Sequence, residues 1–181
     1  MSKQIVQVQD IHTLCQPGKL TIKNTDEFVY VLDNFNVHQT LCIRLPPMHI
    51  VKIEYPYMYV QCTDSKPFHT IDSCIRSSIS SYQWNSLLKT IHHIECLVIR
   101  MDKHVISAFD KNDKRIDWTT CLSSFSEKYM EYVVLFQGYH RQGEVCTPCM
   151  HLIQVKTIDL PTPSIQIDES VNLFHVERTT L

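Results

Sequence analysis

The sequence predicts a mainly β fold, an antiparallel barrel or sandwich with one central helix over about residues 72–91. Two observations carry this prediction. Runs rich in β-branched and aromatic residues occupy both halves of the chain, and their apolar positions alternate or form continuous stretches of strand length. Between the halves lies one segment whose apolar residues recur at helical spacing. Strands, then a helix, then more strands exclude the regular βαβ alternation of a parallel sheet.

The first third of the chain is expected to form three short strands. Residues 19–23 alternate, residues 28–32 form a continuous β-favouring run, and residues 40–45 alternate before two prolines end the strand. Residues 49–62 then predict one long strand. In that strand the alternation puts five side chains on one face if Pro56 marks an edge or a bulge: Val51, Ile53, Tyr55, Tyr57 and Tyr59.

The remaining elements follow in order. Asp72 is the expected helix cap, because helically spaced apolar residues come after it. Residues 94–101 and 105–109 predict a hairpin that turns at residues 102–103. The last expected strands are residues 129–136 and 150–158.

Composition and charge divide the chain in two. With 44% hydrophobic residues, a chain of 181 residues can bury one sizeable core, and we expect a single β-rich domain over residues 1–158. Residues 158–181 hold one base and four acids of the chain's 17 and 19, which leaves 16 bases and 15 acids before them. Residues 159–181 are therefore expected to form an acidic, mobile C-terminal tail, with Pro161 and Pro163 near its start. A near-neutral body permits a local basic groove without requiring one.

The cysteines and the N-terminus indicate a reducing compartment. Eight cysteines are spread along a chain that begins without the apolar stretch of a signal peptide, so reduced thiols are expected. The sequence also has no apolar run of the length that a membrane span needs. We expect the protein in the cytoplasm or nucleus, neither secreted nor in a membrane.

One group of residues is a candidate metal site, formed by Cys146, Cys149, His140 and His151. A Cys-x-x-Cys pair can bind Zn²⁺ with two thiolates, but the second pair that completes a structural site is missing. A β-turn at Pro148 with two ordinary thiols is the favoured alternative. We therefore expect no metal and no cofactor.

Catalytic signatures are weak. His92 and His93 are adjacent, yet no Ser, Cys or Asp stands in a recognisable motif around them, and three glycines are too few for the usual phosphate-binding loop. These observations favour a non-catalytic protein.

Tyr55, Tyr57 and Tyr59 form a ladder at strand spacing, which suggests a binding surface. Exposed flat rings beside cationic groups can stack successive bases of a single strand and contact its phosphates. The candidate nucleic-acid-binding residues are Arg44, Lys52, Tyr55, Tyr57, Tyr59, Arg100 and Lys103. The alternative is that the tyrosines pack the core of the sheet and place only their hydroxyls at its rim.

The element order resembles an oligonucleotide-binding (OB) fold, and residues 132–139 (YVVLFQGY) and 150–156 (MHLIQVK) are similar to the last strands of small viral single-stranded DNA-binding proteins. This resemblance, over roughly residues 18–158, implies an OB-like fold that binds single-stranded DNA or RNA, with an acidic tail that can engage a protein partner. The alternative function is a protein-interaction or virion-structural β-sandwich without a nucleic-acid site.

Overall fold

The computed structural model describes residues 5–16, 19–33, 39–79, 82–102, 104–119 and 129–158. Within these residues thirteen strands form one sheet, accompanied by two α-helices and a 3-10 turn. The fold is mainly β, as the sequence predicts. The helical elements are η1 (Val8–Asp10), α1 (Ile11–Leu14) and α2 (Lys66–Ser78). The strands are β1 (Ile5–Gln7), β2 (Leu20–Asn24), β3 (Phe28–Asp33), β4 (Gln39–Met48), β5 (Ile50–Glu54), β6 (Tyr57–Gln61), β7 (Gln83–Trp84), β8 (Leu88–Ile91), β9 (Ile94–Arg100), β10 (Ser107–Phe109), β11 (Arg115–Ile116), β12 (Met130–Gln142) and β13 (Val145–Thr157).

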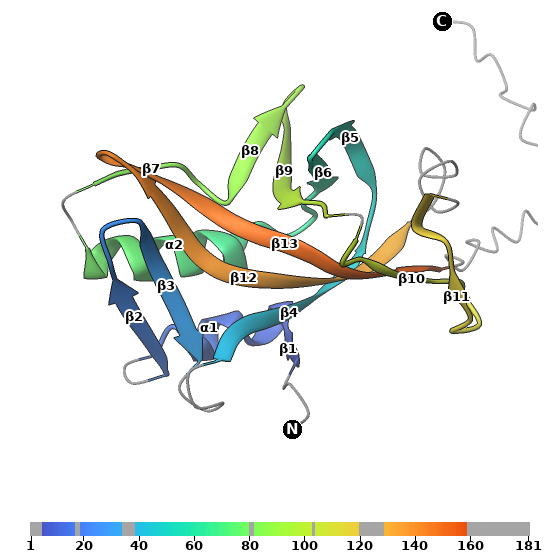
Figure 1. Cartoon of the computed structure of the whole chain (residues 1–181), viewed down its shortest axis with the longest axis horizontal. Coiled ribbons are helices and arrows are strands. Elements are labelled where there is room, and N and C mark those ends of the chain that lie inside the picture. Colours follow the sequence, from blue (N-terminus) through green and yellow to red (C-terminus); the bar gives the residue numbers. More distant parts are fainter. Residues whose placement is uncertain are drawn as a thin grey trace, which may run out of the picture.

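The main path of the sheet runs in the order β1-β4-β3-β12-β13-β9-β6-β5. β4 continues into β5 across His49, although the two strands lie near opposite ends of this order (Figure 1). The sheet therefore curls back on itself. Its pairings still leave β1 and β5 as separate ends within the described residues, so the sheet is open and the closed form of the expected barrel is not formed.

β12 and β13 form a long twisted hairpin that crosses the molecule (Figure 1). Gly143 turns the chain between them with a φ of 63°, which favours glycine. A bulge follows Phe136, and at Gly138 a Cβ atom would lie 2.0 Å from the carbonyl oxygen of Val29. Only glycine lets β3 approach β12 this closely, so Gly138 sets the distance between these two strands.

The core lies between the curled sheet and the helices. α2 buries Phe68, Ile71 and Ile75 against it, and β12 contributes Tyr132 and Phe136. Pro67 lies in the first turn of α2, where its missing N–H costs no helical hydrogen bond. Of the helices in the described part of the chain, none is long and apolar enough to cross a membrane.

The helix prediction was wrong in its bounds. α2 covers residues 66–78, and Asp72 lies buried inside it instead of capping it. The hydroxyls of Ser77 and Ser78 bond back to the Cys74 carbonyl at 2.8 and 3.0 Å, and such bonds compete with the helical backbone. The apolar residues at 87, 88 and 91 continue the helical spacing only by coincidence, because Leu88 and Ile91 lie on β8, paired with β9, and Leu87 directly precedes that strand.

Two strand predictions also need correction. Residues 49–62 form no single strand: β5 and β6 are an antiparallel hairpin that turns at the cis peptide bond between Tyr55 and Pro56. β9 pairs with β8 and not with β10, and their turn uses His92 and His93, both at positive φ. β10 pairs instead with β13 and β11. The two hairpins turn within apolar runs where periodicity shows no break, and β13, one partner of β10, lies far along the chain.

Candidate nucleic-acid interface

Four side chains lie in register across one face of the sheet. His151 on β13 pairs with Arg100 on β9, Arg100 with Tyr57 on β6, and Tyr57 with Glu54 on β5. Residues in register on neighbouring strands point to the same face. An imidazole, a guanidinium, a phenol ring and a carboxylate therefore form one row.

Two adjoining cavities, of about 440 and 410 Å³, are hollowed into this face. They share Tyr57, Val98, Thr147 and Pro148, and we call them together the tyrosine groove. The larger cavity is also lined by Phe28, Arg100, Gln137, His140, Gln142, Cys149, Met150 and His151, and the smaller one by Tyr59, Asn85, Ser86, Leu88 and Lys89. Their combined lining comes from strands distant in sequence.

The three tyrosines of the predicted ladder have different environments. Tyr57 is 41% exposed in the groove, and Tyr55 is 68% exposed in the turn between β5 and β6. Tyr59 is only 7% exposed, and the ammonium groups of Lys52 and Lys89 lie 5.9 and 5.6 Å from the centre of its ring. Of these three tyrosines, Tyr57 thus offers an open ring inside the groove, while the Tyr59 ring is buried near two cations.

The charges that line the groove are positive. Among its described lining residues, Lys89 and Arg100 are cationic and none is a carboxylate. In the part of the chain that the structure describes, Arg100 forms no ion pair. Burial, and then the neighbouring Arg100 charge, hold the pKa of His151 below the usual 6.5 of an imidazole. His151 is therefore neutral at pH 7, and Arg100 supplies the positive charge at this end.

Several residues of the groove were not predicted from the sequence. Phe28 packs its ring against Tyr30, with centroids 4.5 Å apart, and lies 6.3 Å from the ring of His140. Lys89 lies on β8, in a segment that the helical spacing assigned to the wrong element. The local sequence pattern does not indicate that these residues lie near Tyr57, because their proximity results from strand pairing.

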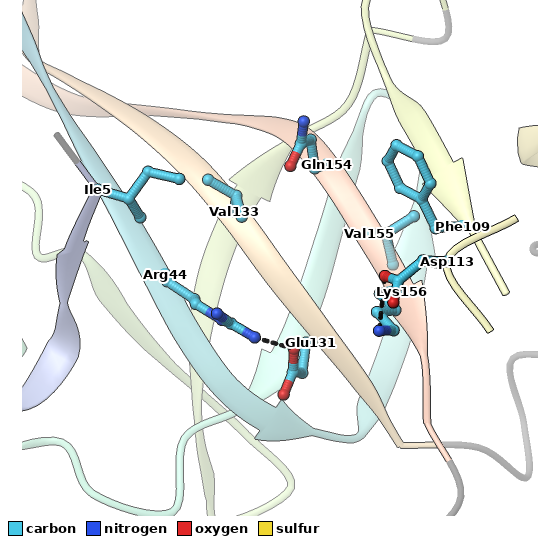
Figure 2. Close-up of a pocket in the computed structure, with 9 residues that line it drawn as sticks. All are labelled: Ile5, Arg44, Phe109, Asp113, Glu131, Val133, Gln154, Val155 and Lys156. Carbon is cyan, nitrogen blue, oxygen red and sulfur yellow. Dashed lines mark hydrogen bonds and ion pairs between the residues drawn. The ribbon is translucent and has the colours of Figure 1, made fainter. Parts of the chain in front are cut away.

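Arg44 lies away from the tyrosine groove. It lines a third cavity of about 270 Å³, where its Nη2 atom is 2.6 Å from Oε2 of Glu131 (Figure 2). Lys156 and Asp113 form a second pair there at 2.7 Å. The charges in this cavity are thus neutralised in pairs. Lys52 is exposed beside Glu54, at 3.0 Å, and Lys103 lies outside the described residues.

The metal candidates do not share one site. Cys146 is fully buried in the core, whereas Cys149, His140 and His151 line the groove. Within the described ranges no group of three or more His, Cys, Asp or Glu side chains is placed to hold a metal ion. The seven cysteines that the structure describes are free thiols, and Cys121 lies outside it. Burial raises the pKa of the Cys149 thiol, which disfavours the thiolate that a metal requires.

No family model and no curated protein matches this sequence. Among solved structures, the chain is similar to the single-stranded DNA-binding protein of bacteriophage Enc34. A C-terminally truncated form gives a TM-score of 0.47 at 9% identity, covering 81% of this chain and 99% of that one. The form in complex with single-stranded DNA gives 0.46 at 9%, covering 80% and 99%, and a third structure gives 0.43 at 10%, covering 83% and 96%. These structures belong to the class of viral single-stranded DNA-binding proteins that the element order of the sequence resembles.

Proposed function

We propose that this protein binds single-stranded DNA or RNA in the tyrosine groove, without catalysing a reaction. One observation carries the proposal: the open ring of Tyr57 lies in register with Arg100, a cation without an ion pair in the described residues. A ring that stacks a base beside a cation that contacts phosphate is the usual arrangement for binding single strands.

The shape and charge of the groove support the same function. An open groove across a sheet accepts an extended strand, whose bases can reach Tyr57 while its phosphates follow the cations. Lys89 and Arg100 lie in the two adjoining cavities with no lining carboxylate among the described residues to repel phosphate. Phe28 and His140 extend the aromatic lining beyond Tyr57.

A second candidate is a protein-interaction or virion-structural domain. It is favoured by apolar side chains on the hairpin of β5 and β6, where Ile53 is 40% and Tyr55 68% exposed. Within the described residues β5 pairs on one side only, and such an edge can accept a strand from another chain.

Direct titration separates the two. A fluorescently labelled 30-base oligothymidine is mixed with the full chain at low salt and its anisotropy is followed over a series of salt concentrations. We expect saturable binding, with an association constant whose logarithm falls linearly with the logarithm of the salt concentration. Duplex DNA of the same length should compete poorly. An oligouridine of the same length compares RNA with DNA. The absence of binding at micromolar protein and low salt contradicts the proposal and favours the second candidate.

Beyond the groove, we propose a protein partner for the acidic tail and a compartment for the protein. Residues 159–181, which lie outside the described residues, carry four acids and one base, and a basic surface on a partner protein is the complementary ligand for such a tail. We propose that the protein acts in the cytoplasm or nucleus, and the free thiols of the described cysteines support this.

A further inference from the structure

Two lysines from different strands meet over one tyrosine ring. Lys52 on β5 and Lys89 on β8 place their ammonium groups 5.9 and 5.6 Å from the centre of the Tyr59 ring. β6, which carries Tyr59, pairs with β5, and β9 joins β6 to β8. Pairing of four strands thus brings together two cations that are 37 residues apart in the sequence.

The Tyr59 ring holds these cations in place. Like charges repel, and the negative face of an aromatic ring offsets part of that repulsion by cation–π attraction. Tyr59 is 7% exposed, so its ring is a fixed support with little free surface for a base. In this position it differs from Tyr57, whose ring is open.

A carboxylate stands beside the pair. Oε2 of Glu54 lies 3.0 Å from Nζ of Lys52, and the hydrogen bond from Lys52, its charge and then the charge of Lys89 lower the pKa of the Glu54 carboxyl. Glu54 is in register with Tyr57 and its side chain is 60% exposed. An exposed pair of this kind is weak and can exchange partners readily. Two lysines against one carboxylate leave one positive charge uncompensated.

We propose that Lys52 and Lys89 bind a backbone phosphate of the single strand, and that Glu54 occupies this phosphate site when nucleic acid is absent. The site rests on the proposed function and deepens it. Lys89 lines the smaller cavity of the groove, and Arg100 lines the larger one beside Tyr57. Lys89 is opposite Cys96, four residues before Arg100 on β9, which at ~3.3 Å per residue is roughly 13 Å. The two phosphate sites are then separated along β9, and Tyr57 lies in register with the Arg100 site.

The variants for the test act on charge at exposed positions. Glu54→Gln removes the competing carboxylate, and we expect binding of the 30-base oligothymidine to tighten by about 1.5- to 5-fold at low salt, the equivalent of one exposed ion pair. This gain should shrink as salt rises. Lys52→Ala and Lys89→Ala should each weaken binding, and Lys89→Ala should flatten the salt slope by about 0.7, as expected for one lost phosphate contact on a single strand.

Glu131→Gln is the matched control. It also removes one carboxylate from an ion pair on the same sheet, but in the cavity of Arg44. Equal tightening by both glutamine variants would show a general effect of net charge and overturn the proposal. In a Lys52→Ala/Lys89→Ala background, Glu54→Gln should tighten binding no more than Glu131→Gln does in the parent.

An oligomer of abasic deoxyribose phosphate separates phosphate from base contacts. We expect Lys89→Ala to weaken binding of this oligomer, and Tyr57→Ala to leave it unchanged. If the parent binds neither oligomer, the proposed function itself fails. If the parent binds and Tyr57→Ala weakens oligothymidine binding, while Glu54→Gln and Lys89→Ala change nothing, only the phosphate site is refuted.

Discussion

The hydroxyl of Tyr139 on β12 donates a hydrogen bond to the carboxylate of Asp72 in α2, and so joins the helix to the hairpin that carries one side of the groove. The Asp72 carboxylate, 4% exposed, also accepts bonds from Ser86 Oγ at 2.7 Å and from the backbone N–H of Leu87 at 3.1 Å. A buried carboxylate is tolerated only when donors surround it. Burial and the Asp72 charge raise the pKa of Tyr139 far above its usual range, so the phenol stays a donor.

The first prediction follows from this contact. Tyr139→Phe removes one donor from a buried carboxylate and should lower the free energy of unfolding by about 1–3 kcal/mol. Tyr132→Phe is the control, since the Tyr132 hydroxyl bonds a neutral carbonyl, that of Met48, at 3.2 Å and its loss should cost only about 0.5–1.5 kcal/mol. Urea unfolding measures both. Equal losses would show that Asp72 gains nothing special from Tyr139.

The second prediction separates the two tyrosines of the groove. Tyr57→Ala should weaken oligothymidine binding by about 1–3 kcal/mol, the worth of one stacked base, and leave the melting temperature near that of the parent. Tyr59→Ala removes a ring that is 7% exposed, so it should lower the free energy of unfolding by on the order of 3 kcal/mol. A loss of stability in Tyr57→Ala as large as in Tyr59→Ala would place Tyr57 in the core.

The third prediction compares two arginines. Arg100→Ala should flatten the salt dependence of binding by about 0.7 in the logarithmic slope, because one phosphate contact is lost. Arg44→Ala should change that slope little, since Arg44 is already paired with Glu131 at 2.6 Å. Anisotropy titrations over the same salt series measure both variants. A larger change for Arg44 than for Arg100 would move the binding surface to the cavity of Figure 2.

The fourth prediction concerns pH. The pKa of His151 is lower in the folded chain than its usual 6.5, so between these two values the unfolded chain binds more protons. Stability is therefore full above about pH 6.5 and falls as the pH drops toward the folded pKa. His151→Gln should reduce this loss, measured as the urea midpoint at pH 7.5 and pH 5. An unchanged difference between the two pH values would show that His151 does not contribute.

The fifth prediction concerns the acidic tail. Truncation after Ile158 removes four acids and one base, so the unfolding midpoint should stay unchanged and nucleic-acid binding should tighten at low salt. A full-length variant with the four carboxylates replaced by amides should bind as tightly as the truncated chain. If truncation unfolds the domain, the division at residue 158 is wrong.

The mainly β fold class was predictable, because the alternation of apolar residues that indicates strands is a local feature of the sequence. Residues 28–32 and 40–45 are strands as expected, and the final two expected runs lie within β12 and β13 except for one residue each, 129 and 158. The helix bounds and the hairpins were missed, since both depend on which strand a segment pairs with. For the candidate site, Tyr57 and Arg100 were named and lie in register, while Arg44 lies elsewhere. The binding roles of all these residues stay predictions.

Local pattern was enough to predict a mainly β protein with an acidic end, because alternation, composition and charge are properties of neighbouring residues. Which rings and charges face one groove depends on how the strands pair. Arg44 is neutralised by a glutamate 87 positions away, and Lys89 is set over Tyr59 through two strand pairings. Such contacts depend on the register between distant strands, where a shift of one residue sends each side chain to the opposite face.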